Sequence, residues 1–346
     1  MKNDVKSICD RLIKNRNNTV RFFHNEKDNA FFLTPAFIFT TRGMVVDGKD
    51  IDNCVKEIKE SGLNRFEKIF VASKMSLVDD SEGYLSDVLW AYSKIRKRKL
   101  KDTGLDILAS VLICDAGKVF DTEQILDEAE FLLEKMKNKH PYYVEDADLC
   151  AAILLVLSER NTSDIFADIE SMYREMKDGF SGNYEYAYSL CQMLATYKGE
   201  SEEKSGRMLE LFSLFKEKQL RFGKNSLYSV AALLADVSDD AEAIAEEAEW
   251  VSGYLSKKRS FSFLSMANDE RIAYAAFIVY LSYFRDEQTI STRDEGACVS
   301  RAAVHRTMLF AIMKILIGKE KQKLKRSELI SAVTTVAKIY EDGENE

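Results

Sequence analysis

The stretch Cys150-Ala151-Ala152-Ile153-Leu154, in the middle of the chain, decides the fold. Its small residue, followed three positions later by a large aliphatic one, belongs to a pattern that also occurs elsewhere between residues 108 and 278. The other copies are Leu108-Ala109-Ser110-Val111-Leu112, Leu190-Cys191-Gln192-Met193-Leu194, Val230-Ala231-Ala232-Leu233-Leu234 and Tyr274-Ala275-Ala276-Phe277-Ile278. A small side chain lets a neighbouring helix approach closely, and an aliphatic one a turn away fills the space beside it. The pattern therefore predicts helices that pack against one another in the same way.

Two weaker copies precede these, with Ala36 and Phe39 and then Ala72 and Met75 in the same two columns. The small residues follow one another at separations of 36, 37, 42, 40, 40 and 44 positions. Periods of this size are typical of repeats built from a pair of helices. The second helix of a pair is visible as apolar residues at helical spacing, for example within residues 125–136. We therefore predict about seven α-α hairpins of roughly 40 residues each.

The composition also favours an all-α fold. The chain contains 2 prolines, whereas average usage would give roughly 17, and proline disrupts helix interiors. We predict a single helical-repeat domain over residues 1–340, because hairpins of this size are stable only when stacked. Within it we expect less regular repeats in 1–100, the clearest repeats in 101–285 and capping helices in 286–340, with an acidic tail at 341–346. The preferred arrangement is an open superhelix, and a closed α/α toroid is the alternative.

Charge and hydropathy limit the location and the partners. The net charge of −8 argues against general nucleic-acid binding, which requires a basic footprint. The N-terminus lacks the apolar region of a signal peptide, and the longest apolar runs are shorter than the roughly 20 residues that a membrane span needs. We therefore expect a cytoplasmic protein without membrane contact. The six cysteines are scattered singly, which favours small buried hydrophobes over a zinc site or a disulfide framework.

The segment Phe32-Leu33-Thr34-Pro35-Ala36, followed by the repeats through Ala275, resembles a bacterial family of uncharacterised proteins, domain of unknown function 4003. The resemblance extends over roughly residues 5 to 320 and lies in the pattern of helical copies, not in a diagnostic motif. It implies a helical-repeat fold. It implies no activity, cofactor or site, because the family has none that can be carried over.

Motifs of known catalytic centres are missing from the sequence. The chain contains no HExxH, GxSxG or GxGxxG and no glycine-rich phosphate loop. The three histidines, His24, His140 and His305, are far apart in sequence. Acidic clusters such as 145–148 come just before predicted helices, where carboxylates complement the helix dipole. A divalent metal or an acid–base pair is the alternative for this cluster, but we predict neither a metal nor a cofactor.

Two basic runs, at 94–101 and 319–326, stand out against the acidic background. Both are expected near the ends of predicted helices, where cations suit the carboxyl-terminal dipole. The first has six basic residues within eight positions, more than capping requires, so contact with an anion or an acidic partner is the alternative. The candidate basic patch consists of Arg96, Lys97, Arg98 and Lys99.

Tyrosines lie at or beside the first helices of consecutive predicted hairpins. In stacked hairpins these helices line one face, usually the concave one. Tyrosine has a large apolar body and a polar tip, which suits peptide binding and also suits the edge of a core. The candidate binding residues are Asp148, Tyr186, Tyr188, Tyr228 and Arg271.

The function favoured by these observations is an interaction module that binds a peptide or protein segment on its concave face. The alternative is an enzyme in a closed toroid, whose central pocket would collect carboxylates and tyrosines that no short motif reveals. Binding of nucleic acid or another anion through the basic runs is a less favoured third possibility. A closed barrel with carboxylates clustered at one mouth would favour the enzyme, and an open ribbon would disfavour it.

Overall fold

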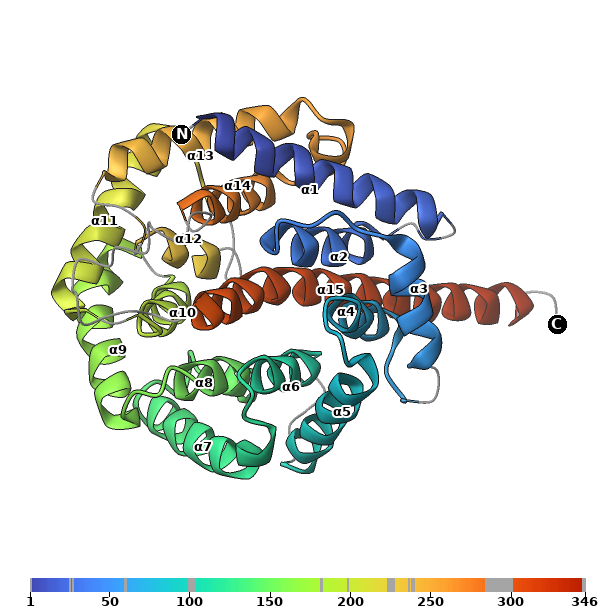
Figure 1. Cartoon of the computed structure of the whole chain (residues 1–346), viewed down its shortest axis with the longest axis horizontal. Coiled ribbons are helices and arrows are strands. Elements are labelled where there is room, and N and C mark those ends of the chain that lie inside the picture. Colours follow the sequence, from blue (N-terminus) through green and yellow to red (C-terminus); the bar gives the residue numbers. More distant parts are fainter. Residues whose placement is uncertain are drawn as a thin grey trace.

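In the computed structural model the chain is built from helices (Figure 1). The structure describes residues 2–24, 26, 28–58, 61–98, 104–180, 183–197, 199–222, 228–235, 237, 240–283 and 301–343. Within these ranges no residue lies in a β-strand, so the all-α prediction is confirmed. Lys99 of the candidate basic patch and residues 344–346 of the acidic tail lie outside the described residues.

Helices on the outside of the molecule alternate along the chain with helices on the inside. The outer helices are α1 (Lys2–Phe22), α3 (Gly48–Glu57), α5 (Ser81–Lys97), α7 (Thr122–Lys139), α9 (Thr162–Met176), α11 (Ser201–Glu217) and α13 (Ala241–Ser256). The inner helices are α2 (Asn29–Thr41), α4 (Arg65–Met75), α6 (Leu105–Asp115), α8 (Leu149–Val156), α10 (Tyr184–Leu194), α12 (Tyr228–Leu234) and α14 (Asn268–Tyr283). The last helix is α15 (Arg301–Gly343), and the short 3-10 segments are η1 (Val119–Asp121), η2 (Asp146–Asp148), η3 (Lys177–Phe180) and η5 (Arg259–Phe261).

Hydrophobic patterning explains which helices are inside. Every residue of α8 is buried, and α14 is buried continuously from Glu270 to Leu281. A helix that is apolar on all sides must be enclosed, whereas an amphipathic helix covers the core with one face. The outer helix α7 is of the second kind, because its buried apolar residues recur at helical spacing from Ile125 to Met136. The small and large columns found in the sequence, for example Ala231 and Leu234, are buried in the inner helices.

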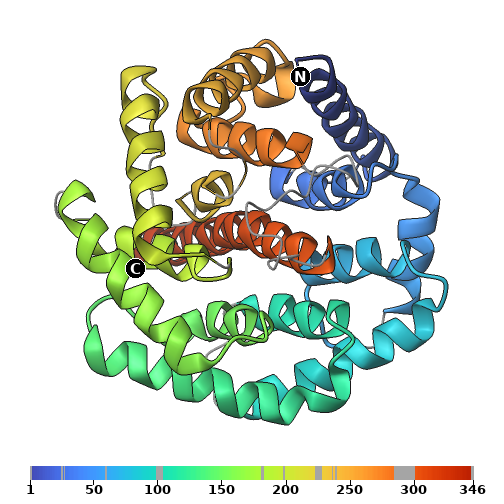
Figure 2. The same cartoon turned by 60° about the vertical axis from the view of Figure 1, so that its left-hand side comes forward.

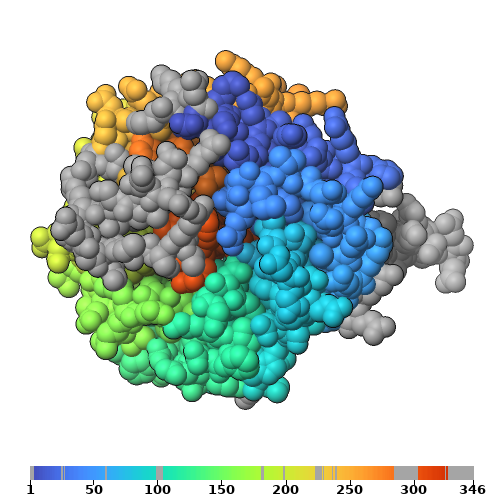
Figure 3. All heavy atoms as spheres, in the orientation of Figure 1, coloured from blue at the N-terminus to red at the C-terminus, as the bar shows by residue number. Residues whose placement is uncertain are grey.

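The first and last helices of this row meet. Helix α1 packs against α13 and α14 as well as against α2, and in Figure 3 the dark-blue atoms of the N-terminal helix lie beside orange atoms. Asp10 accepts a hydrogen bond from Tyr254 of α13, and Arg16 donates one to Ser260 at 2.6 Å. An open superhelix would leave its two ends apart, so these contacts do not support the preferred arrangement.

Helix α15 runs through the middle of the ring formed by the other helices (Figures 1 and 2). It contacts α2, α6, α8 and α12, and its apolar residues between Val304 and Ile317 are buried. The sequence instead predicted a pair of capping helices here. The structure has one helix of 43 residues, because the segment between Ile317 and Glu328 contains no proline and consists mainly of good helix formers. The concave inner face is therefore occupied by the chain's own helix.

The inner helices begin at one common end of the ring, which we call the amino-terminal mouth. Lys319 of α15 pairs with Glu270 at the start of α14, and Lys323 pairs with Asp28, the N-cap of α2, at 2.6 Å. At the opposite end, His305 lies with Arg42 and Asp115, at the ends of α2 and α6. Helix α15 is thus antiparallel to the inner helices and carries its lysines to the amino-terminal mouth.

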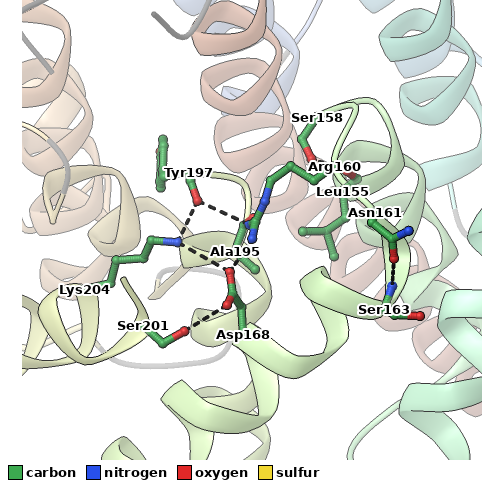
Figure 4. A network of polar contacts seen from close by, with 10 residues as sticks. All are labelled: Leu155, Ser158, Arg160, Asn161, Ser163, Asp168, Ala195, Tyr197, Ser201 and Lys204. Atoms are coloured by element: carbon green, nitrogen blue, oxygen red, sulfur yellow. Dashed lines mark hydrogen bonds and ion pairs between the residues drawn. The ribbon is translucent and has the colours of Figure 1, made fainter. Parts of the chain in front are cut away.

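A polar network lies at the carboxyl-terminal ends of α8 and α10 (Figure 4). Arg160, which follows α8, donates to the carbonyl oxygens of Ala195 at 2.9 Å and Tyr197 at 3.4 Å. The same guanidinium pairs with Asp168, and Lys204 donates to the Tyr197 carbonyl at 2.6 Å. The carbonyls at the end of a helix have no partner within the helix. We therefore assign this network a structural role, as the cap of α10.

Candidate functional site

A cavity of about 230 Å³ lies at the amino-terminal mouth, between α10, α15 and η2. Two helices form opposite walls, and each contributes residues at spacings of three, four and seven positions, which lie on one helix face. The α10 wall consists of Glu185, Tyr188, Ser189 and Gln192, and the α15 wall of Lys314, Ile317, Gly318 and Lys321. Leu105 of α6, Tyr143, Glu145, Ala147 and Asp148 complete the lining.

The α10 wall offers a hydrogen-bond acceptor. Gln192 is 2% exposed, and its amide nitrogen donates to the sulfur of Met136 at 3.7 Å. Within the described part of the chain, its amide oxygen accepts no hydrogen bond. This oxygen can therefore accept a hydrogen bond from a ligand in the cavity.

The α15 wall offers cations. The Lys314 ammonium donates to the Ser189 hydroxyl at 3.1 Å and lies 5.7 Å from the centre of the Phe310 ring. Among the described residues, no carboxylate lies within ion-pair distance of Lys314. Lys321 extends from the same face two turns further along. Between them, Gly318 leaves open space, because a Cβ atom placed on it would meet no atom within 4 Å.

The third wall carries carboxylates. Asp148 ends η2, and one of its oxygens accepts the Glu145 backbone N–H at 2.9 Å. The Glu145 carboxylate in turn accepts the backbone N–H of Asp148, so the two residues cap the turn before α8. Burial raises the pKa of Asp148, and Lys314 acts in the opposite direction. A partly desolvated carboxyl group and an ammonium group therefore share one cavity.

Aromatic rings form the floor of the cavity on the α10 side. The Tyr188 side chain is 1% exposed, and its hydroxyl donates to Glu170 of α9 at 3.1 Å. The same carboxylate binds His140 at 2.9 Å, and the His140 and Tyr188 rings lie 4.6 Å apart. Burial, together with Glu170, raises the pKa of Tyr188 well above its usual range. Because its hydroxyl is engaged inside the protein, Tyr188 contributes an apolar ring to the cavity.

The structure brings two of the five candidate binding residues, Asp148 and Tyr188, into this cavity. The rings of Tyr186 and Tyr228 contact each other at 5.6 Å but do not line it. Arg271 is buried at the start of α14, where it donates to the Phe261 carbonyl at 3.3 Å and to the Asn268 side chain. Its position indicates a structural role.

The described residues of the candidate basic patch, Arg96, Lys97 and Arg98, lie at the end of α5, as expected, and two of them have partners within the protein. Arg98 pairs with Glu123, Asp127 and Glu130 of α7 at 2.9, 2.8 and 3.0 Å. Arg96 lies 3.7 Å from Asp106, and Lys97 is exposed. This part of the run therefore fastens α5 to its neighbours.

The second basic run was expected near a helix end, and that expectation is wrong. It lies inside α15, because that helix continues to Gly343. There Lys319 and Lys323 pair with carboxylates of the ring, and Lys321 lines the cavity.

The acidic segment before α8 was the best candidate for a metal in the sequence. Its carboxylates have partners, since Glu145 and Asp148 cap each other and Asp146 pairs with Lys137. Among the described residues, no group of three histidine, cysteine or acidic side chains is placed to hold a metal ion.

Lys314, Gln192 and Gly318 were not among the residues selected from the sequence. The sequence feature that could have identified them is the same spacing of residues on one face of each helix. These residues are 185, 188, 189 and 192 on α10 and 314, 317, 318 and 321 on α15. This spacing becomes informative only once the two helices are known to lie opposite each other.

Comparison with known proteins confirms the resemblance seen in the sequence. The model of a family described as "Protein of unknown function (DUF4003)" matches residues 18–321, a span that contains every residue lining the cavity. No curated protein and no solved structure matches the chain. In the part of the chain that the structure describes, no helix is both long and apolar enough to cross a membrane.

Proposed function

We propose a function from the site alone, because the chain belongs to the DUF4003 family, whose description assigns no activity. The protein binds a peptide or protein segment, and the cavity at the amino-terminal mouth holds one residue of that segment. The observation that carries this proposal is the cavity between α10 and α15, in which the Gln192 oxygen and the Lys314 ammonium have bonding capacity left.

The arrangement that supports this proposal is a closed α/α toroid of hairpins around α15. Contacts of α1 with α13 and α14 favour closure over an open superhelix. Because buried residues of α15 fill the inner face, a segment has access to the mouth of the ring rather than to its concave interior. We therefore place the peptide-binding surface at the amino-terminal mouth, and not on the concave face expected from the sequence.

The size of the cavity suits one residue. Its volume of about 230 Å³ is below the roughly 300–1,000 Å³ of pockets that enclose whole drug-sized ligands. Tyr143 and Tyr188 supply apolar rings, and charged groups of both signs surround them. Pockets that combine aromatic surface with a few polar groups are typical anchor sites for a side chain of a partner.

The experiment uses Gly318 to close the cavity without disturbing the fold. Gly318→Leu places a side chain in open space, and it removes a glycine from a helix, which favours folding by up to about 1 kcal/mol. Gly253→Leu is the matched control, because Gly253 is exposed in α13 and also has no atom within 4 Å of its Cβ position.

Random peptides displayed on phage with free C-termini are selected on the wild-type protein, and the affinities of the selected peptides are measured by calorimetry. We expect Gly318→Leu to weaken binding at least tenfold and Gly253→Leu to leave it unchanged. A selection that yields no binder, or equal affinities for the two variants, would contradict binding in this cavity.

An enzyme is the second candidate, favoured by the raised pKa of Asp148 beside a cavity that also contains Lys314. A carboxyl group with a raised pKa keeps its proton to a higher pH, which suits it to donate a proton to a substrate. Asp148→Asn would abolish a hydrolytic or elimination activity. A broad substrate screen in which wild type and variant behave identically would count against the enzyme.

A further inference from the structure

We propose that the cavity recognises an amino-acid unit that carries both an ammonium group and a free carboxylate, such as a C-terminal lysine or a free amino acid. The inference rests on the proposed function and specifies the chemistry of the residue that is bound. It follows from the distribution of acceptors and donors over the walls of the cavity.

Acceptors for an ammonium group lie on the η2 and α10 walls. One oxygen of Asp148 is used by the Glu145 N–H, and among the described residues the other accepts no hydrogen bond. The Gln192 amide oxygen is also without a donor there, although its residue is 2% exposed. A primary ammonium group has three donors, so it can use more than one of the acceptors that line the cavity.

Donors for a carboxylate lie on the α15 wall. Lys314 has one described hydrogen bond, to Ser189, and no carboxylate partner among the described residues. A cation partly removed from water is stabilised by an anion with which it forms charge-assisted hydrogen bonds. The inner helices α6 and α10 begin at the same mouth, and the positive ends of their dipoles favour a negative group there.

Because the cavity contains both Asp148 and Lys314, it disfavours ligands that carry only positive or only negative charge. A purely cationic group would neutralise Asp148 and leave Lys314 without an anion, whereas a purely anionic group would add repulsion from Asp148 and Glu145. An internal residue of a peptide does not carry both groups, because lysine lacks a carboxylate there and aspartate or glutamate lacks an ammonium group. A C-terminal lysine or a free amino acid supplies both groups within one residue, in keeping with the small volume of the cavity.

Calorimetric titration of the full-length protein with matched probes tests this inference. The first probe is an N-acetylated peptide of four alanines and a C-terminal lysine. In the second probe the C-terminal carboxylate is amidated, and in the third the lysine is replaced by norleucine, which removes the ammonium group. The fourth probe is free L-lysine. We expect the first probe to bind at least tenfold more tightly than the second and the third.

Two variants assign the preferences to individual residues. Asp148→Asn keeps an acceptor for the Glu145 N–H, and we expect it to lose the preference for lysine over norleucine. Lys314→Met keeps the apolar stem, and we expect it to lose the preference for carboxylate over amide. Lys135→Met, on the exposed surface of α7, is the control and should retain both preferences. Unchanged melting curves establish that the variants are folded.

The outcomes separate the inference from the function on which it rests. Tight binding of free L-lysine without binding of the peptide supports the recognised chemistry and contradicts binding of a segment. Equal affinities for the first three probes, or no binding of either lysine-containing probe with a free carboxylate, overturns the inference. Whether segments bind at all is decided independently by the phage selection with Gly318→Leu.

Discussion

Replacement of Phe310 by alanine tests the position of α15 as the core of the ring. Phe310 is 1% exposed on this helix. Deleting a buried phenyl ring loses its transfer free energy and leaves a cavity, at a cost of about 3–5 kcal/mol in the free energy of unfolding. With an unfolding entropy of about 2.1 cal/mol/K per residue, this loss lowers the Tm of a 346-residue chain by about 4–7 °C.

The assay is differential scanning calorimetry of the wild type and the variant, supported by urea unfolding at 25 °C. Phe120→Ala is the matched control, because it makes the same chemical change at a side chain that is 94% exposed. We expect it to change stability by no more than about 0.5 kcal/mol. If Phe310→Ala melted within 1 °C of the wild type, as the control should, α15 could not be the centre of the core.

Three further substitutions test other parts of the fold. Ala231→Leu overpacks a fully buried position of the small column, so urea unfolding should show a loss of about 1–3 kcal/mol, and no loss would refute the predicted packing. Arg160→Met leaves the Ala195 carbonyl without its guanidinium donor, and the same measurement should show a loss of about 1.5–3 kcal/mol; an unchanged midpoint would remove the capping role. Burial and Asp28 raise the pKa of Glu320 from 4.5 to about 7. Between these two pH values the native state binds more protons than the unfolded state, so the stability of the wild type should fall as the pH rises from 4.5 to about 7. The pKa of Asp28 is lowered, so Asp28 titrates below this range. Glu320→Gln should therefore be more stable than wild type by on the order of 1 kcal/mol at pH 8, after allowance for solvent screening, and similar to it at pH 5; equal melting temperatures of the two proteins at pH 8 would contradict this assignment.

The helical fold was predictable because its signal is local. The scarcity of proline and the spacing between small and aliphatic residues such as Ala151 and Leu154 depend only on the sequence nearby, and these positions are buried as expected. The choice between an open superhelix and its alternative, a closed toroid, was not predictable in the same way. It depends on contacts such as that between Asp10 and Tyr254, which are 244 residues apart and belong to no common pattern.

The position of α15 was missed for a related reason. Its apolar segment around Met313 resembles one more hairpin helix, and only contacts with several inner helices reveal that it lies inside the ring. For the same reason the sequence analysis did not identify the α15 wall of the cavity. Asp148 and Tyr188 occupy the same position of the predicted repeats, two residues before Cys150 and Leu190. Lys314 belongs to no repeat and becomes significant only because it lines the same cavity as α10.

The central claim is that a segment binds at the amino-terminal mouth while α15 continues to fill the ring. Hydrogen–deuterium exchange of the full-length protein, with and without the tightest peptide from the phage selection, tests it most directly. We expect slow exchange of residues 304–317 in both states and additional protection of residues 185–192 and 314–321 when the peptide is bound. Faster exchange of residues 304–317 in the complex would contradict the claim, because it would mean that the segment displaces α15 and binds the concave face instead.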